Sequence, residues 1–133
     1  MGARKRNKAK ELKKIKENLS SARLNNCPTS PRKMRLVADL IRGLNIEKAL
    51  TELKFNPKEA SRRLEKLLMS AISNWESKNE GKSIDQSDLF ISEIKVDGGR
   101  MLKRIQAAPQ GRAHRIRKRS NHVTLVIDSR NNK

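Results

Sequence analysis

The stretch that decides the fold is LFISEIKVDGGRMLKRIQAAPQGRAHRIRKRSNHVTLVID, residues 89–128. Both of its ends alternate apolar and polar residues, as half-buried β-strands do. The apolar positions are Phe90, Ile94 and Val96 in one arm and Val123, Leu125 and Ile127 in the other. The point midway between the arms falls beside Pro109-Gln110-Gly111, a turn-forming sequence. The pattern therefore predicts one long β-hairpin over 89–128, with its tip at about 106–111.

The middle of this stretch is strongly basic, because no Asp or Glu lies between Asp97 and Asp128. Its cations are Arg100, Lys103, Arg104, Arg112, Arg115, Arg117, Lys118 and Arg119. Their mutual repulsion, and too few apolar residues for a separate core, make the far end of the hairpin unstable alone in water. The insert therefore needs a polyanion around it, and this density of charge indicates nucleic acid.

The composition of the insert favours folded RNA as the polyanion. Arginine dominates its cations, and arginine makes bidentate contacts with phosphate and stacks on bases. The insert contains no Phe, Tyr or Trp, so it lacks the aromatic platforms of proteins that bind single strands on a sheet. We therefore expect recognition through RNA shape and phosphates.

The charge of the whole chain is unevenly spread. The 133 residues carry 32 Lys and Arg against 14 Asp and Glu, a formal net charge of +18. The basic excess lies in the first 16 residues and in the hairpin, whereas the segment between them is nearly neutral. We interpret residues 20–133 as a single domain and residues 1–19 as a basic extension. Residues 8–19 could form a helix there, with Leu12 and Ile15 on a thin apolar stripe, ordered only on a partner.

The nearly neutral segment predicts three helices. The first begins at Ser30-Pro31, an N-cap followed by Pro at the first helical position, and ends at Gly43. The second covers 46–55, and the third opens at Asn56-Pro57 with Glu59 completing a capping box. The predicted core positions are Met34, Val37, Ala38, Ile41, Ile46, Ala49, Leu50, Leu53, Ala60, Leu64, Leu67, Leu68, Ala71, Ile72 and Trp75. With a short strand at 22–27 and a loop at 78–88, the class is α+β: three helices packed on a small antiparallel sheet with a long protruding basic β-hairpin.

Several functional classes find no support in the sequence. A single cysteine, Cys27, forms no internal disulfide and fits a reducing cytosol. His114 and His122 lack the spacing and partners of a metal site, and Gly98-Gly99 lacks the residues of a phosphate cradle, so we expect neither metal nor cofactor. No nucleophile motif frames the Ser, His and Asp residues, which argues against an enzyme. No apolar run approaches the ~18 residues of a membrane span, and no signal peptide is visible.

A DNA-binding or nucleoid protein is the alternative hypothesis. The helix pair 31–55, with a turn at Gly43, could mimic a helix-turn-helix. Its second helix carries Glu47 and Glu52 against Lys48 and Lys54. That balance suits a negatively charged groove poorly.

Five segments resemble one known family. They are SPRKMRLVADLIRG at 30–43, LKFNPK at 53–58, VDGG at 96–99, LKRI at 102–105 and GRAHRIRKRSNHVT at 111–124. In order and spacing they are similar to the L-twenty-two family of bacterial large-subunit ribosomal proteins, over about residues 24–127. The tip departs from the family pattern, since Gln106-Ala-Ala-Pro-Gln-Gly111 lacks the charge that is common there. The Lys-rich extension is also longer than a minimal member needs.

The resemblance implies a structural constituent of the large subunit of a cytoplasmic ribosome. It implies three helices on a three-stranded antiparallel sheet, binding to 23S-type ribosomal RNA, contacts with neighbouring ribosomal proteins and help in subunit assembly. The hairpin tip would line the nascent-peptide exit tunnel with Gln106, Ala107, Ala108, Pro109, Gln110 and Gly111. The candidate RNA-binding residues are Arg32, Lys33, Arg35, Arg42, Arg100, Lys103, Arg104, Arg112, Arg115, Arg117, Lys118 and Arg119.

Overall fold

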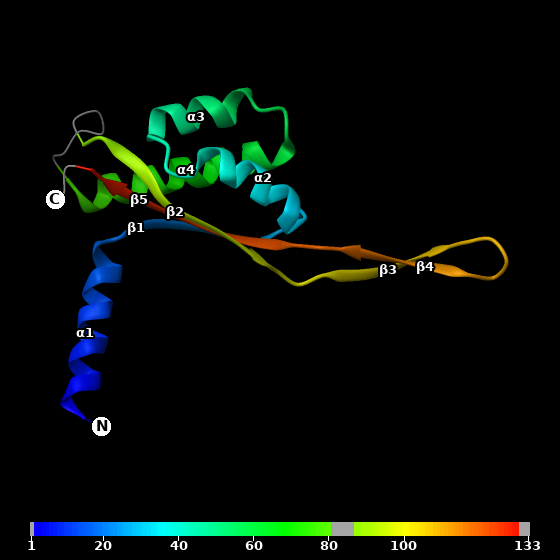
Figure 1. Ribbon diagram of the computed structural model, residues 1–133, viewed down its shortest axis with the longest axis horizontal. Helices are drawn as coiled ribbons and strands as arrows, with labels where there is room; N and C mark the ends of the chain where they lie inside the picture. The colour runs from blue at the N-terminus through cyan, green and yellow to red at the C-terminus, as the bar shows by residue number, and fades with distance from the viewer. Residues whose placement is uncertain (1, 81–86, 131–133) are drawn as a thin grey trace.

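The computed structural model describes residues 2–80 and 87–130, with the backbone alone at 16–18. Its elements are α1 (Ala3–Asn18), β1 (Ser20–Cys27), α2 (Pro31–Ile41), α3 (Ile46–Phe55), α4 (Glu59–Lys78), β2 (Leu89–Gly98), β3 (Leu102–Ala107), β4 (Ala113–Lys118) and β5 (Asn121–Ser129). Helices α2, α3 and α4 cover one face of a sheet formed by β1, β5 and β2, while α1 points away from this body (Figure 1). The predicted α+β class is confirmed.

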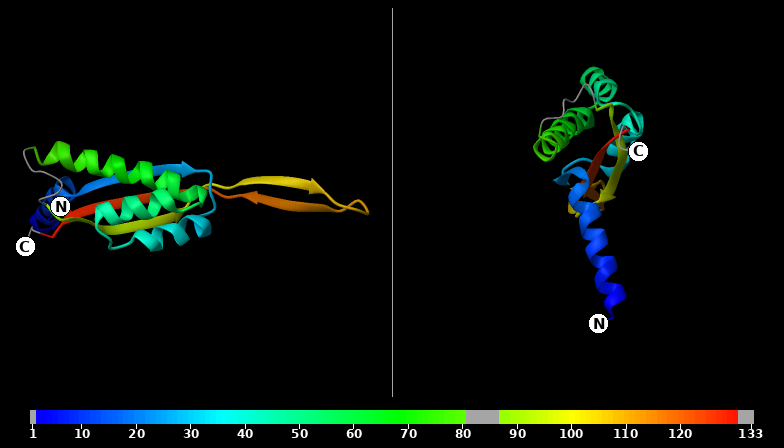
Figure 2. Two further views of the ribbon diagram at one scale, coloured as in Figure 1. Left: turned by 90° about the horizontal axis from the view of Figure 1, so that it is seen from above. Right: turned by 90° about the vertical axis from the view of Figure 1, so that its left-hand side faces the viewer.

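The sheet places β5 between β1 and β2, and both of its pairings are antiparallel. Leu125 lies opposite Ala22 on one side and Ile94 on the other. Because β5 has a neighbour on each side and helices over one face, Val123, Leu125 and Ile127 are all buried, as the alternation predicted. The other views show the same layers, with α4 running alongside β1 (Figure 2).

A β-bulge in β2 interrupts the predicted alternation of Phe90, Ile94 and Val96. Ile91 pairs with Ile127, but Glu93 pairs with Val126, so Ser92 is an extra residue in this strand. The bulge switches the face on which alternate side chains lie, and Leu89 and Ile91 enter the core ahead of it. Phe90 is therefore only half-buried, and its ring packs beneath the guanidinium of Arg130, 5.4 Å from the ring centroid.

Helix α2 begins and ends where the sequence predicts. Pro31 is its first residue, although the side chain of the N-cap residue Ser30 makes no capping hydrogen bond. After the helix Gly43 adopts φ +75°, the left-handed conformation expected there. Its N–H donates to the carbonyl of Ile91, and the Ile91 N–H donates to the carbonyl of Leu44, which ties the helix end to the edge of β2.

Helices α3 and α4 supply most of the remaining core. All of their predicted core positions are buried except Leu50 and Ile72, which are half-buried. The predicted capping box is wrong, because α4 begins at Glu59 itself. The side chain of Asn56 instead accepts a hydrogen bond from the Lys58 N–H, and Glu59 accepts from Arg63.

The hairpin consists of two paired segments. The body segment is β2 with β5, and the distal segment is β3 with β4, from Leu102 opposite Lys118 to Ala107 opposite Ala113. At its end the Ala108 N–H donates to the carbonyl of Arg112, and Gln110 and Gly111 adopt φ +62° and +70°. Positive φ at both central residues is typical of a type I′ turn, which suits a two-residue hairpin loop. The turn is tighter than predicted, since Gln106 and Ala107 belong to β3.

Helix α1 begins at Ala3, five residues before the predicted start at residue 8. Leu12 and Ile15 are exposed on it, and its link to the body includes a hydrogen bond from Lys78 Nζ to the carbonyl of Leu19. Of the loop predicted at 78–88, residues 81–86 lie outside the described residues. Among the described helices, none combines the length and apolar character needed to cross a bilayer.

Candidate nucleic-acid interface

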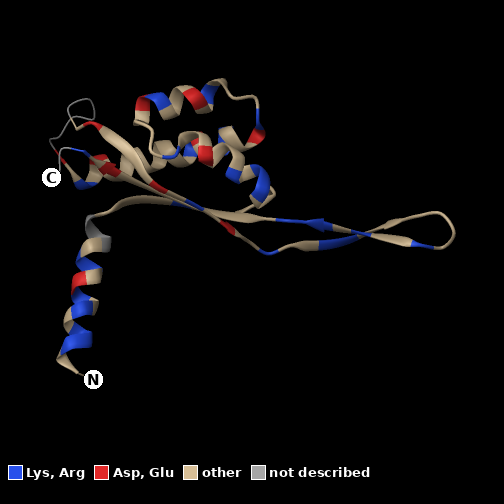
Figure 3. Ribbon diagram, in the orientation of Figure 1, with Lys and Arg blue, Asp and Glu red and all other residues tan. Residues whose placement is uncertain are grey.

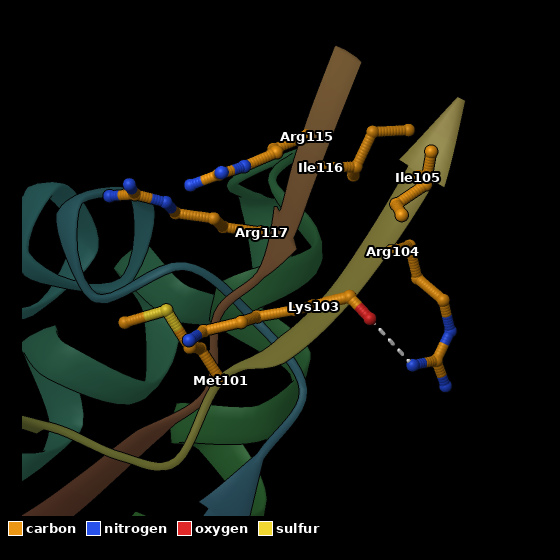
Figure 4. Close-up of a pocket in the computed structure, with 7 residues that line it drawn as sticks. All are labelled: Met101, Lys103, Arg104, Ile105, Arg115, Ile116 and Arg117. Atoms are coloured by element: carbon orange, nitrogen blue, oxygen red, sulfur yellow. Dashed lines mark hydrogen bonds between the residues drawn. The ribbon is translucent and has the colours of Figure 1, made fainter. Parts of the chain in front are cut away.

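The distal hairpin presents cations on both of its faces. Alternation along β3 and β4 directs Lys103, Arg115 and Arg117 to one face and Arg104 to the other, as Figure 4 shows. Lys118 shares the face of Arg104 by the same alternation, and all five side chains are exposed. An anion on one side only would leave half of this charge unneutralised, so the geometry suits a strand pair surrounded by polyanion.

The pairing of β3 with β4 leaves one repulsion that the protein does not relieve. Lys103 lies directly opposite Arg117, and like charges in that position destabilise a sheet. Arg115 lies opposite Ile105 and Arg104 opposite Ile116, so the stems of these arginines run beside apolar side chains. No carboxylate occurs between residues 97 and 128, so neutralisation must come from another molecule.

A second group of predicted residues meets at the hairpin root. Arg32, Lys33 and Arg35 from α2 line a groove of about 650 Å³ together with Arg119, the residue after β4. The groove lies at the N-terminus of α2, where backbone N–H groups and the helix dipole favour an anion. Because Ser30 gives no side-chain cap, these groups are not occupied by its hydroxyl. Figure 3 shows this basic corner joining the basic hairpin.

Two of the predicted RNA-binding residues already have partners in the body. Arg35 donates from Nε and Nη2 to the carbonyl of Val96, at 3.3 and 3.1 Å. Arg42 donates from Nη1 to the carbonyl of Ile94 at 3.0 Å and from Nη2 to Asp39 at 2.9 Å. These bonds cap carbonyls on the outer edge of β2, so both arginines hold α2 against the strand from which the hairpin extends.

The remaining predicted residues lie at the bends. Arg100 lies in the link between β2 and β3, where its carbonyl accepts a hydrogen bond from the Ser120 hydroxyl. Arg112 follows the left-handed pair of the turn, next to the uncharged tip. Both side chains are exposed.

Sequence reasoning assigned Arg62 only a possible ion pair with Glu65 and assigned no role to Lys66, although both are exposed cations on α4. Among the described residues Glu65 and Arg62 form no such pair. The spacing of four residues between Arg62 and Lys66, which places them on one face of a helix, was the available signal. This spacing was overlooked because the surrounding segment is nearly neutral overall. Within residues 2–80 and 87–130 no group of three or more His, Cys, Asp or Glu side chains could hold a metal ion.

The sequence of this chain matches a known family. The family model described as ribosomal protein L22p/L17e matches residues 22–128, which include all of the sheet except Ser20 and Ser21 of β1 and Ser129 of β5. The chain belongs to this family. Curated relatives named large ribosomal subunit protein uL22 extend the similarity to nearly the full length. Those of Christiangramia forsetii and Flavobacterium johnsoniae are 64% and 62% identical over 132 residues, covering 99% of this chain and 98% and 96% of theirs. The relative from Porphyromonas gingivalis is 58% identical, covering 99% of this chain and 98% of its own.

Proposed function

We propose that this protein is a non-enzymatic structural constituent of the large ribosomal subunit that binds large-subunit RNA through its hairpin and hairpin root. The supporting observation is the hairpin itself, with cations on both faces of β3 and β4 and no carboxylate between residues 97 and 128. Membership of the L22p/L17e family supports the assignment to the large ribosomal subunit. The protein then works in the cytoplasm, as part of the ribosome.

The proposed RNA contacts differ in kind. Lys103, Arg104, Arg115, Arg117 and Lys118 contact phosphates along the hairpin, with Arg100 and Arg112 at its bends. Arg32, Lys33 and Arg119 bind at the root groove, where α2 adds its dipole. Arg35 and Arg42 contribute charge from positions already fixed on β2. Such contacts assist assembly, because RNA segments on opposite sides of the hairpin are brought together by one rigid element.

The tip has a different proposed role. Ala108, Pro109, Gln110 and Gly111 carry no charge, whereas Arg104 and Arg112 flank them. Charged flanks anchor the arms in RNA, and a small neutral turn borders an open channel without gripping what passes. We assign the tip to the wall of the nascent-peptide tunnel, together with Gln106 and Ala107 at the ends of the strand.

The DNA-binding alternative gains no support. In the helix pair α2 and α3, Arg42 is engaged with Ile94 and Asp39 rather than free for a groove. Helix α3 carries Glu47 and Glu52 beside Lys48 and Lys54, as the sequence shows.

The proposal is tested by the salt dependence of binding to a large-subunit RNA transcript. Each neutralised phosphate releases counterions, so affinity should fall steeply with salt. Arg115→Gln with Arg117→Gln should lower the slope of log K against log salt by about two. The control Lys48→Gln with Lys54→Gln removes the same charge from α3 and should leave the slope unchanged. Equal slopes for both double variants would contradict the proposed RNA contacts.

A further inference from the structure

A groove between α4 and β1 lies outside the hairpin and its root. Arg62, Arg63 and Lys66 of α4 line it, and its volume is about 550 Å³. Leu67, which is buried, and Leu24, which is half-buried, also line this groove. The α4–β1 groove therefore combines cations with apolar surface along the β1 edge of the sheet, beside the first half of α4 (Figure 2).

The charge balance of the α4–β1 groove is positive even after internal pairing. Glu59 is the one carboxylate among its lining residues, and its Oε1 accepts from Arg63 Nη2 at 2.7 Å and Nε at 3.2 Å. This hydrogen bond raises the pKa of Arg63 above its ordinary value. The positive guanidinium and the negative carboxylate of this pair cancel, which leaves Arg62 and Lys66 as excess charge. In the described parts of the chain no carboxylate forms an ion pair with Arg62 or Lys66.

The spacing of these two cations matches an extended anion. Arg62 and Lys66 are one turn apart on α4, so they form a row along the helix. Like charges at this spacing destabilise a free helix, and an anion that spans both removes the penalty. A nucleic-acid strand supplies consecutive phosphates joined by sugars that can pack on Leu24 and Leu67. An acidic polypeptide fits less well, because its carboxylates lie on alternate sides of an extended chain.

We propose that the α4–β1 groove is a second RNA-binding site, in which Arg62 and Lys66 hold the sugar-phosphate backbone. The inference rests on the proposed function, since it takes the partner to be the same large-subunit RNA. It adds a contact on the β1 side of the body to those at the hairpin and at the α2 root groove, so the RNA holds the body on two of its sides.

The test uses the full chain carrying Arg62→Gln and Lys66→Gln, with a large-subunit RNA transcript as the probe. Glutamine keeps helix propensity close to that of Arg and Lys, and thermal melting followed by circular dichroism checks the fold. The slope of log K against log salt should fall by about two relative to the intact chain. The matched control is Lys48→Gln with Lys54→Gln on α3. A groove variant with the control's slope would overturn the inference.

The hairpin variant Arg115→Gln with Arg117→Gln, measured in parallel, separates the inference from the proposed function. If only the hairpin variant lowers the slope, the α4–β1 groove is not an RNA site while the hairpin assignment stands. If neither does, both fail. If the decreases in slope add in the variant that carries all four substitutions, the groove and the hairpin are two independent sites.

Ultraviolet cross-linking of the intact chain to the same transcript gives a second reading. Nucleotide-bearing peptides from residues 59–70 support the groove, and cross-links confined to the hairpin and its root count against it. A groove variant that binds the transcript like the intact chain, yet loses binding to poly-glutamate, would place an acidic polypeptide there and overturn the RNA assignment.

Discussion

At the scale of single residues, the cations of α2 and its C-cap residue Arg42 form two groups with different roles. Arg35 and Arg42 donate to the carbonyls of Val96 and Ile94, whereas no hydrogen bond to the body engages the side chains of Arg32 and Lys33 in the structure described. Sequence alone could not separate them, because all four are basic residues on one short helix or at its C-cap. The two groups should therefore differ in their effects on the free energy of unfolding and on RNA binding.

We expect Arg35→Ala and Arg42→Ala each to lower the free energy of unfolding of the free protein by about 1 kcal/mol, because a carbonyl on the edge of β2 loses its donor. Arg32→Ala and Lys33→Ala should change it by less than about 0.5 kcal/mol, as exposed substitutions do. Urea denaturation measures these differences.

In the measurement of RNA binding, Arg32 and Lys33 should matter, although their substitution hardly changes the free energy of unfolding. Each substitution there should lower the salt slope by about one. If Arg32→Ala destabilised the body as much as Arg42→Ala, the division between the two groups would be wrong.

At the scale of elements, the direction of the hairpin is set at Gly98-Gly99. The Gly99 N–H donates to the carbonyl of Ser120 at 2.8 Å, and a Cβ on Gly99 would lie 2.6 Å from Ser120 Oγ. A Cβ on Gly98 would meet nothing within 4 Å. These two adjacent glycines therefore differ in their tolerance of a side chain.

Gly99→Ala should destabilise the free protein by about 1–3 kcal/mol, since either the link or Ser120 must move to relieve the overlap. Gly98→Ala is the matched control and should stay within about 0.5 kcal/mol. Urea denaturation of both variants checks this, and equal stability of the two would show that the link adjusts without cost.

The tip and its flanks should also behave differently. Ala108→Leu and Gln110→Asn should leave large-subunit yield nearly intact and alter peptide-dependent pausing, because the uncharged turn is assigned to the tunnel wall. Asparagine tolerates the φ of +62° at residue 110. Arg104→Gln and Arg112→Gln should reduce incorporation first. Gradient analysis of subunits with ribosome profiling compares the sets, and tip variants that lose subunits without a change in pausing would place the turn inside RNA.

The sequence predicted these elements well where local signals and burial agreed. The caps and apolar stripes located α2 and α3, and the turn at Pro109-Gln110-Gly111 located the hairpin. The bulge at Ser92 was missed because one extra residue leaves no local signature, and it places Phe90 on the face opposite to that of Ile94. The capping box at Asn56 failed because the helix starts three residues later. The partners of Arg35 and Arg42 could not be predicted, since they are backbone carbonyls distant in the sequence.

At the scale of the whole molecule, the excess positive charge lies mainly outside the part that contains the hydrophobic core. The core lies in α2, α3, α4 and the three-stranded sheet, while the cations concentrate in α1 and the hairpin, which project from it (Figure 3). Because the net charge is +18, electrostatic repulsion disfavours packing of these projections against the body. The molecule is therefore built to be completed by a polyanion much larger than itself.

The central claim, that this polyanion is the RNA of the large ribosomal subunit, is tested most directly by sedimentation. A cell lysate at moderate salt is separated on a sucrose gradient, and the protein is followed by immunoblot. We expect the protein to travel with the large subunit and to be released only as salt rises, because its contacts are with phosphates. If it stays at the top of the gradient at moderate salt, or travels with DNA, its polyanion is not the RNA of the large subunit.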